Sequence, residues 1–324
     1  MGEGTEIAKA LVSPVNKLID CVKCAFGKIY EPIHIRRIAK ANAFALKTMQ
    51  EVIDDNPTLA QAYNNGMIKI ENDKINGLAI RSLERSLYQE MVKQQNLESV
   101  ISKTYGLLDG EPDVIDEPVE QDWMMRFANS VETISDDDMQ LLWAKVLAGE
   151  IKKPKSYSLR TLESLKNLSK EEALLFQKHC EYVISETKCS YFLNEEDLLK
   201  KSNIDMDIIL RLSECGIAND SGFINRDFRF QSNESKIIYN DNIIIIMQNK
   251  TSQTLTFTCQ VYPLTNFGCD LISIINQQTS DAYLLDYAQF LKCRFKNIKV
   301  TAHRIIEKTG MNFRINQDID LLDK

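Results

Sequence analysis

The residues that most resemble a chemical site are Glu150 and Lys152, in the stretch Gly-Glu-Ile-Lys-Lys-Pro that begins at Gly149. A Glu-x-Lys spacing forms half of a nuclease-like metal site. A second acid, usually on an adjoining strand, completes such a site by helping to bind the divalent ion that activates water. Here the flanking sequence is helical and no strand is evident. We interpret the stretch as a joint between helices, and keep a metal-dependent nuclease that uses Glu150 and Lys152 as an alternative.

Thiols and imidazoles could also do chemistry, but their spacing does not favour it. Cys21 and Cys24 form a lone pair, without the second pair of ligands that a structural zinc site needs. His179 and Cys180 are neighbours on an expected helix and therefore point in different directions. The other histidines, His34 and His303, are far away in the sequence. Phosphate-binding glycine loops and the common hydrolase motifs are absent. The sequence predicts no enzyme, no cofactor and no metal site.

The composition is that of an ordinary globular protein. The chain has 324 residues, 44% of them hydrophobic and 26% charged, which is enough for two or three domains. Its longest apolar run, Ile243 to Met247, is far shorter than the roughly 20 residues that span a bilayer. The N-terminus lacks the anatomy of a signal peptide, and the eight scattered cysteines suit reduced thiols. We expect a cytoplasmic protein, or one peripheral to the inner membrane.

Residues 1–30 predict an amphipathic helix, because apolar side chains recur at steps of three and four. The candidate interaction residues on this face are Leu11, Val15, Leu18, Val22 and Phe26. The first 50 residues hold eight basic and four acidic side chains, although the whole chain has a net charge of −7. The apolar face suits packing on the body of the protein or on another subunit. The lysines leave open a peripheral membrane contact through residues 1–30. A second helix is expected from Ile33 to Ile53.

Residues 61–108 contain no proline and predict one long helix. An apolar residue occupies every fourth position of its middle part, at Ile75, Ala79, Leu83, Leu87 and Met91. This narrow, partly polar seam suits antiparallel packing or subunit association. We take Leu83, Leu87 and Met91 as further interaction residues, and expect a homo-oligomer.

Helix capping accounts for the sequence around the joint. Ser135 is expected to cap a helix that ends at Gly149 in a left-handed conformation. Ser158 is expected to begin the next helix, and Ser169 with Glu172 forms a capping box for the one after it. Upstream, residues 109–122 are rich in acids and contain two prolines, which predicts a solvated linker.

The sequence after Lys188 predicts two short helices followed by β-rich runs at 235–249 and 254–265, an order typical of a winged helix. A winged-helix DNA-binding regulator is therefore the second alternative. The expected recognition helix, Asp205 to Cys215, carries three acids and one arginine. A helix that reads the major groove needs cations for phosphates. We do not expect nucleic-acid binding, although basic residues gather later in the chain, at Lys292, Arg294, Lys296, Lys299 and Arg304.

Several stretches resemble an uncharacterised bacterial family known only as a domain of unknown function. The most specific are WAKVLAGEI at 143–151, SYSLRTL at 156–162 and LSKEEA at 168–173. PIHIRRIAKA at 32–41, QNLESV at 95–100 and LTNFGCDL at 264–271 resemble other parts of that family. The resemblance implies no reaction and no catalytic residue. Some families of this kind occur among bacterial anti-phage genes, so it suggests a role in defence against phage.

These observations predict a mainly α fold, with long helices in the N-terminal two-thirds and a winged-helix-like α+β domain at the C-terminus. The expected divisions are a helical head and long helix (1–108), an acidic linker (109–122), a helical domain (123–187) and the α+β domain (188–324). The expected function is that of a non-enzymatic, oligomeric interaction protein in anti-phage defence, as a sensor or an abortive-infection-type effector. Its partner would be another protein or a phage component.

Overall fold

The computed structural model describes residues 11–26, 73–186, 189–219, 221–310, 312–316 and 319–323. Within these ranges, the description does not extend to the side chains of Phe26, residues 73–84 and Leu87. The chain divides into two compact units, residues 1–166 (unit 1) and 167–324 (unit 2). The division falls inside the expected helical domain 123–187. The helix expected from Ile33 to Ile53 lies outside the described residues.

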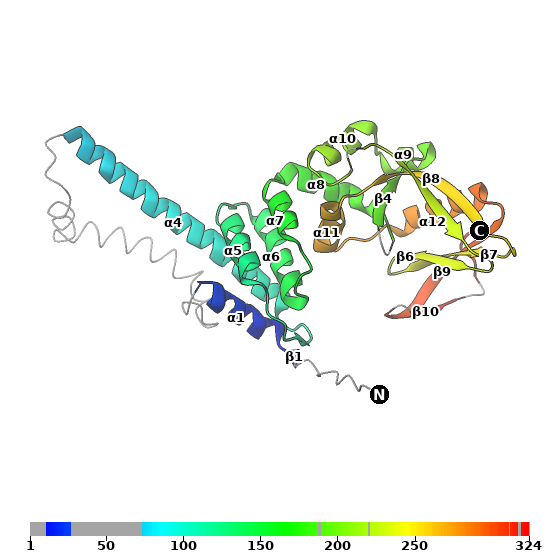
Figure 1. The fold of residues 1–324 in the computed structure, drawn as a ribbon, viewed down its shortest axis with the longest axis horizontal. Helices are drawn as coiled ribbons and strands as arrows, with labels where there is room; N and C mark the ends of the chain where they lie inside the picture. The colour runs from blue at the N-terminus through cyan, green and yellow to red at the C-terminus, as the bar shows by residue number, and fades with distance from the viewer. Residues whose placement is uncertain are drawn as a thin grey trace, which may run out of the picture. The chain divides into compact units, whose positions relative to one another are not determined.

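Unit 1 is a group of helices with one small two-stranded sheet (Figure 1). Its elements are β1 (Leu11–Val12), α1 (Pro14–Phe26), α4 (Asp73–Leu108), β2 (Val114–Ile115), α5 (Gln121–Val131), α6 (Asp137–Lys152) and α7 (Leu159–Lys166).

The core of unit 1 forms where the C-terminal part of α4 packs on α5 and α6. The ring of Phe127 on α5 lies between Trp123, at 5.4 Å, and Trp143 on α6, at 5.6 Å. Gln140 on α6 ties the helices together: its amide donates to Ile134 O (2.9 Å) and accepts from Ser99 Oγ on α4 (2.7 Å). Burial of the aromatic rings therefore holds α5 against α6, and the hydrogen bond of the buried amide holds α4 against α6.

The acidic segment expected to be a linker is part of unit 1. β2 pairs with β1 in antiparallel register, and the Lys17 ammonium of α1 donates to Ile115 O (3.0 Å). Val119, just before α5, is buried. The segment therefore holds α1 against the other helices of the unit.

The joint after α6 differs from its prediction in two respects. Asp136, not Ser135, caps α6, since its carboxylate accepts from the N–H groups of Asp138 and Met139 at 3.1 Å each. The helix does not end at Gly149 but runs on to Lys152. Gly149 is needed for a different reason: a Cβ there would lie 2.8 Å from the ring of Tyr157.

The two downstream capping predictions are confirmed. Ser158 Oγ accepts from Thr161 N–H (3.1 Å) at the start of α7. Ser169 and Glu172 form the expected capping box, in which each side chain accepts from the other's backbone N–H.

Unit 2 combines two four-stranded antiparallel sheets with helices. Its elements are α8 (Lys170–His179), the 3₁₀ turn η1 (Cys180–Tyr182), β3 (Ile184–Glu186), β4 (Cys189–Leu193), α9 (Glu196–Ser202), α10 (Met206–Glu214), β5 (Ile224–Phe230), β6 (Ser235–Tyr239), β7 (Ile243–Asn249), β8 (Leu255–Pro263), α11 (Asn266–Ile275), α12 (Asp281–Arg294), β9 (Ile298–Thr309) and β10 (Asn312–Ile315).

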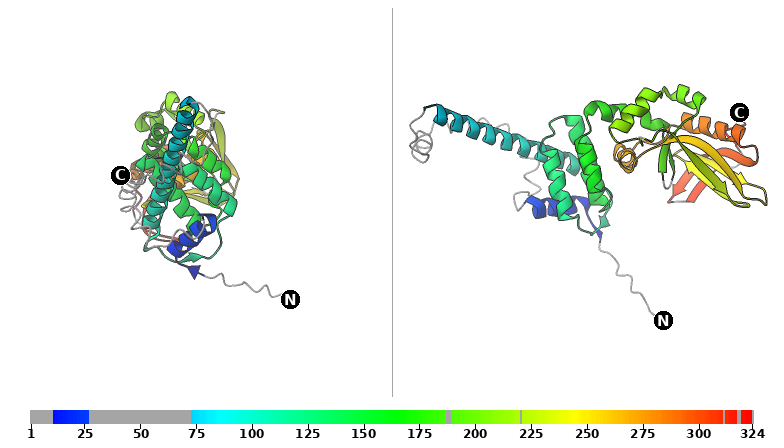
Figure 2. Two further views of the ribbon diagram at one scale, coloured as in Figure 1. Left: turned by 90° about the vertical axis from the view of Figure 1, so that its left-hand side faces the viewer. Right: turned by 45° about the horizontal axis from the view of Figure 1, so that its top comes forward.

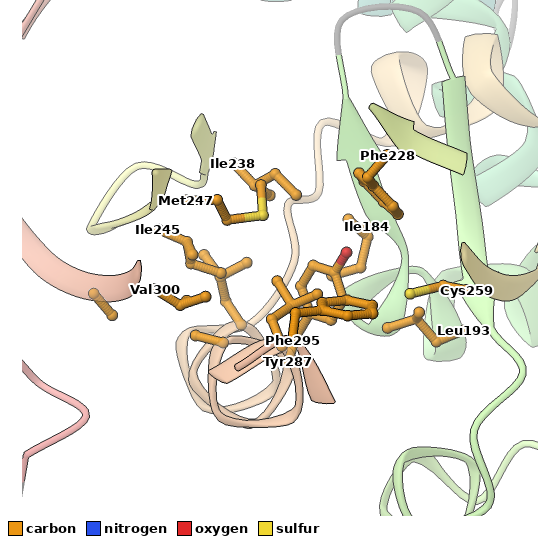
Figure 3. Packing of buried hydrophobic residues seen from close by; sticks show 14 of the residues in the cluster. Ile184, Leu193, Phe228, Ile238, Ile245, Met247, Cys259, Tyr287, Phe295 and Val300 are labelled. Atoms are coloured by element: carbon orange, nitrogen blue, oxygen red, sulfur yellow. The ribbon is translucent and has the colours of Figure 1, made fainter. Parts of the chain in front are cut away.

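One sheet has the strand order β3-β4-β8-β5 and the other the order β10-β9-β7-β6. The two sheets and α12 share a single hydrophobic core. Figure 3 shows Tyr287 of α12 and the adjoining Phe295 between Ile245 and Val300 of one sheet and side chains such as Leu193 of the other. Tyr287 is completely buried, so α12 is the element on which both sheets pack.

The expected fold class is wrong. The described residues contain ten strands in three antiparallel sheets, so the protein is an α+β mixture rather than mainly α. In unit 1, α4 alone among the described helices is long; the others have 8 to 16 residues. The pairing expected for a winged helix also fails. β7 pairs with β6 and β9, whereas β8 pairs with β4 and β5, so the two β-rich runs belong to different sheets.

The close approach of Gly149 and Tyr157 gives a stability prediction. In an exposed helix, Gly→Ala normally stabilises by about 1 kcal/mol. We expect Gly149→Ala to lower the free energy of unfolding of unit 1 by about 1–2 kcal/mol instead, since the new methyl group overlaps a buried ring. Both tryptophans, Trp123 and Trp143, lie in unit 1, so urea unfolding followed by tryptophan fluorescence measures this unit.

Gly106→Ala is the matched control. Gly106 lies in α4, and a Cβ there would meet no atom within 4 Å. This variant should be as stable as the native protein or more so. Equal stability of the two alanine variants would contradict the packing role of Gly149.

Candidate functional site

The Glu150 carboxylate is buried at the end of α6 and binds the backbone of the following loop. One oxygen accepts from Lys155 N–H (2.5 Å) and the other from Tyr157 N–H (3.1 Å). Burial raises the pKa of Glu150, while these backbone hydrogen bonds act in the opposite direction. The carboxylate therefore fixes the joint, and in this conformation both oxygens already have partners.

Lys152, the other half of the nuclease hypothesis, does not join Glu150. Its ammonium lies 2.8 Å from the carboxylate of Glu111, at the surface of unit 1. Among the described residues, no three His, Cys, Asp or Glu side chains are grouped so that they could hold a metal ion. The geometry gives the nuclease hypothesis no support.

The other chemically active side chains are also held in structural roles. His179 is buried and its Nδ1 lies 2.8 Å from Leu175 O, one turn earlier in α8. Burial raises the pKa of Cys180 to about 12. A thiol with that pKa stays protonated near neutral pH and is a poor nucleophile. Cys21 lies in α1 with a pKa that burial also raises, and Cys24 is exposed.

The apolar face of α1 is used inside unit 1. Leu18 and Val22 are both 1% exposed, and α1 contacts α4, α5 and α6. Val15 is half-buried and Leu11, in β1, is exposed. The side chain of Phe26 lies outside the description. The structure therefore brings most of this predicted surface together as an internal packing face.

The long helix α4 has two parts with different surroundings. All of its buried described residues lie between Asn96 and Leu108, where it packs on α6. We call residues 73–95 the α4 extension. Figure 2 shows this part of α4 running beyond α5, α6 and α7 of the same unit. Its described side chains from Arg85 to Glu90 are exposed, and Tyr88 is 67% exposed.

The α4 extension carries three of the predicted interaction residues, Leu83, Leu87 and Met91. Met91 is half-buried, and the side chains of Leu83 and Leu87 lie outside the description. Tyr88 was not among the interaction residues predicted from the sequence. Its position beside Leu87 could have indicated it, because tyrosine is common in protein interfaces.

A partly buried polar network in unit 2 was also not predicted from the sequence. The Arg226 guanidinium on β5 pairs with one carboxylate oxygen of Glu186 on β3, and the Tyr191 hydroxyl donates to the other. The hydroxyls of Tyr191 and Tyr287 lie 3.4 Å apart. Burial raises the pKa of both tyrosines well above the usual value, so they stay protonated. Local spacing could not reveal this network, because its members come from four separate elements.

The expected recognition helix, α10, buries Ile209 and Leu212 and exposes Met206 and Leu210. Its one basic residue, Arg211, faces solvent. The exposed residues of α10 are Met206, Leu210, Asp207, Arg211 and Glu214, so its one cation lies beside two acids and the helix does not suit phosphate binding.

Comparison with known families identifies the family of this chain. The model of DUF2806, described as a protein of unknown function, matches residues 80–287, which is more than half of the chain. The chain belongs to the DUF2806 family. The match includes residues of both units, and within it lie the joint, most of the α4 extension and the Glu186–Arg226 pair. The resemblance to an uncharacterised domain family is thereby confirmed. No curated protein and no solved structure matches the chain.

Searching the residues that the structure describes, we find no helix with the length and apolarity needed to cross a bilayer.

The environment of Glu150 predicts a pH-dependent effect of Glu150→Gln. The variant should lose about 1–3 kcal/mol of unfolding free energy, because the amide nitrogen of glutamine cannot accept from a backbone N–H, whereas both oxygens of a carboxyl group, protonated or ionised, can. The folded-state pKa of Glu150 is raised, so native stability falls as pH rises from the unfolded-state pKa through the folded-state pKa. The difference between native protein and variant should therefore be largest at acidic pH and shrink as pH rises. Urea unfolding across the acidic range measures it.

Lys152→Ala is the matched control, because Lys152 forms only a surface pair. Its effect should stay below about 1 kcal/mol. The same proteins should leave plasmid DNA and RNA intact in Mg²⁺ or Mn²⁺. Cleavage that disappears in Glu150→Gln would establish the nuclease instead.

Proposed function

We propose that this protein is a non-enzymatic interaction protein that self-associates through the α4 extension. Two observations support the proposal. The titratable groups tested above are engaged in packing, capping or buried pairs rather than grouped around a reactive centre. In addition, the α4 extension runs beyond the helices of its own unit and exposes an aromatic ring, Tyr88.

The sequence of the α4 extension suggests how two copies would meet. Residues four apart on an α-helix differ by 400°, so the stripe from Ile75 to Met91 shifts by about 40° at each step. Such a stripe is a ridge of the i±4 type, inclined by about 26° to the helix axis. Two copies that interlock these ridges cross at about −50°, whereas a coiled coil needs a repeat of 3.5 residues. We therefore propose a two-fold symmetric crossing of two α4 helices.

Leu87→Asp tests the association. Leu87 lies on the proposed ridge, and a carboxylate there would be desolvated in the contact between two copies. We expect the native protein to form dimers and Leu87→Asp to shift to monomers by at least tenfold in dissociation constant, about 1.4 kcal/mol. Sedimentation velocity over a range of protein concentrations measures the shift.

Gln89→Asp provides the control, since it adds the same charge two residues away, on the opposite side of the helix. It should leave the dissociation constant nearly unchanged. A native protein that stays monomeric, or equal effects of the two variants, would refute association through this ridge.

We also propose that the protein acts in anti-phage defence, as a sensor or an abortive-infection-type effector. The support for this setting is the family resemblance described from the sequence. Cells that carry the gene should show fewer phage plaques than cells that lack it, and Leu87→Asp should restore plating if assembly is required. Equal numbers of plaques on cells with and without the gene, across a panel of phages, would contradict the proposed role in defence.

A further inference from the structure

A cleft of about 390 Å³ lies in unit 2 beside the open edge of a sheet. One wall is Ile237, Ile238 and Tyr239 of β6, the last strand in the order β10-β9-β7-β6. Another is Ser185 and Glu186 of β3, the edge strand of the second sheet. The remaining wall comes from the end of α11 and the segment 276–279 that follows it.

The register of β6 directs backbone groups into this space. At the two ends of the β6–β7 ladder, Asn249 N–H donates to Glu234 O and Asn240 N–H donates to Ile243 O. Antiparallel ladders alternate, so Lys236 and Ile238 bond to β7 between these points. The N–H and C=O groups of Ser235 and Ile237 therefore point away from β7, toward the open edge.

This edge carries less protection than the outer edge of the other sheet, because its one charged residue, Lys236, is engaged with Glu234 and with the ring of Phe230. Natural edges are shielded by charges, prolines or bulges. The outer strand β5 exposes Asn225, Asp227 and Arg229 in this way. On β6 the corresponding outward position is Ile237, whose apolar side chain is 40% exposed.

The walls of the cleft are held in place by hydrogen bonds. Gln278 donates to Asp241 (2.8 Å), and Thr279 O accepts from the Asn240 amide (2.9 Å), so the 276–279 segment is tied to the β6–β7 turn. On the other side, the Glu186 carboxylate is held by Arg226 and Tyr191. A site built in this way needs little reorganisation on binding.

We propose that the cleft binds an extended peptide, which adds to β6 as a further antiparallel or parallel strand. Main-chain hydrogen bonds to Ile237 and its neighbours supply the affinity, as in other cases of strand addition. The cleft has walls from β3 and from residues 276–279 beside the β6 edge, and an extended chain is narrower than the sheet edge of a folded second copy, so we take the extended chain as the occupant. The inference does not depend on self-association through α4.

The lining also indicates which peptides fit. Among the lining residues, all of them described, Glu186 is the one acid and there is no lysine or arginine; most of the others are neutral amides, hydroxyls and isoleucines. The charge of Glu186 is balanced by its ion pair with Arg226, and no lining residue is a cation that could pair with an acidic side chain. The preferred peptide is neutral, with an apolar residue beside Ile237.

Selection from a displayed library of random heptapeptides on the full-length protein tests this proposal. Enriched peptides should be poor in Asp and Glu. One of them, synthesised with a fluorophore, should bind Ile237→Pro about tenfold more weakly, since proline removes the outward N–H without touching the ladder to β7. Ile237→Val keeps the N–H and should bind within about twofold of native protein. Equal binding to Ile237→Pro and Ile237→Val, or no enrichment, would overturn the proposal.

Amide hydrogen exchange provides a measurement that does not require the proline variant to fold. In native protein, the amides of Ser235 and Ile237 should exchange fast and slow down when the selected peptide is added. The amides of Lys236 and Ile238, bonded to β7, should be slow in both states. Peptide binding that leaves the Ile237 amide fast would refute strand addition. Protection of that amide in concentrated protein alone would identify a second copy as the occupant and overturn the peptide proposal.

Discussion

The buried carboxylate of Glu150 is the constraint on which the organisation of unit 1 depends. A buried carboxylate is tolerated only where hydrogen bonds replace its water. Glu150 meets that condition by accepting from the backbone N–H groups of Lys155 and Tyr157. The loop is thereby folded back over α6, and Tyr157 comes to rest against Gly149. The Tyr157 carbonyl in turn accepts from the Trp123 indole (2.9 Å), so that one acidic side chain sets the positions of α5, α6 and the start of α7.

Unit 2 is organised around an apolar element instead. Two sheets that share no strand would each leave a hydrophobic face uncovered, and α12 supplies the side chains that fill the space between them. Tyr287 adds a polar end to this packing, where its hydroxyl meets Tyr191 and, through it, the Glu186–Arg226 pair. The side chains of Arg226 and Glu186 are 27% and 19% exposed, and an ion pair at this depth contributes little net stability. Here the pair connects β3 to β5, the two edge strands of one sheet.

The burial of these side chains affects which groups can take part in a function. Glu150, His179, Cys180, Tyr191 and Tyr287 are each buried and engaged with a neighbour, and burial keeps the thiol and the phenols protonated. The two surfaces that we propose for binding, the α4 extension and the open edge of β6, would act through shape and main-chain groups rather than through a reactive atom. The match to the DUF2806 family, residues 80–287, includes most of the α4 extension and all of β6, and the family names no activity.

The sequence by itself determined the features that depend on a few neighbouring residues. The capping box of Ser169 and Glu172 and the Ser158 cap at the start of α7 were predictable, because their signals lie within one turn of chain. Only the tertiary structure decided which strands pair, that Gly149 leaves room for the ring of Tyr157 eight residues later, and that Glu186 pairs with Arg226. Strand pairing joins segments such as β4 and β8, some 70 residues apart, and is selected by burial of a shared face. No local pattern encodes that choice, since the free energy that decides it arises only when distant residues meet.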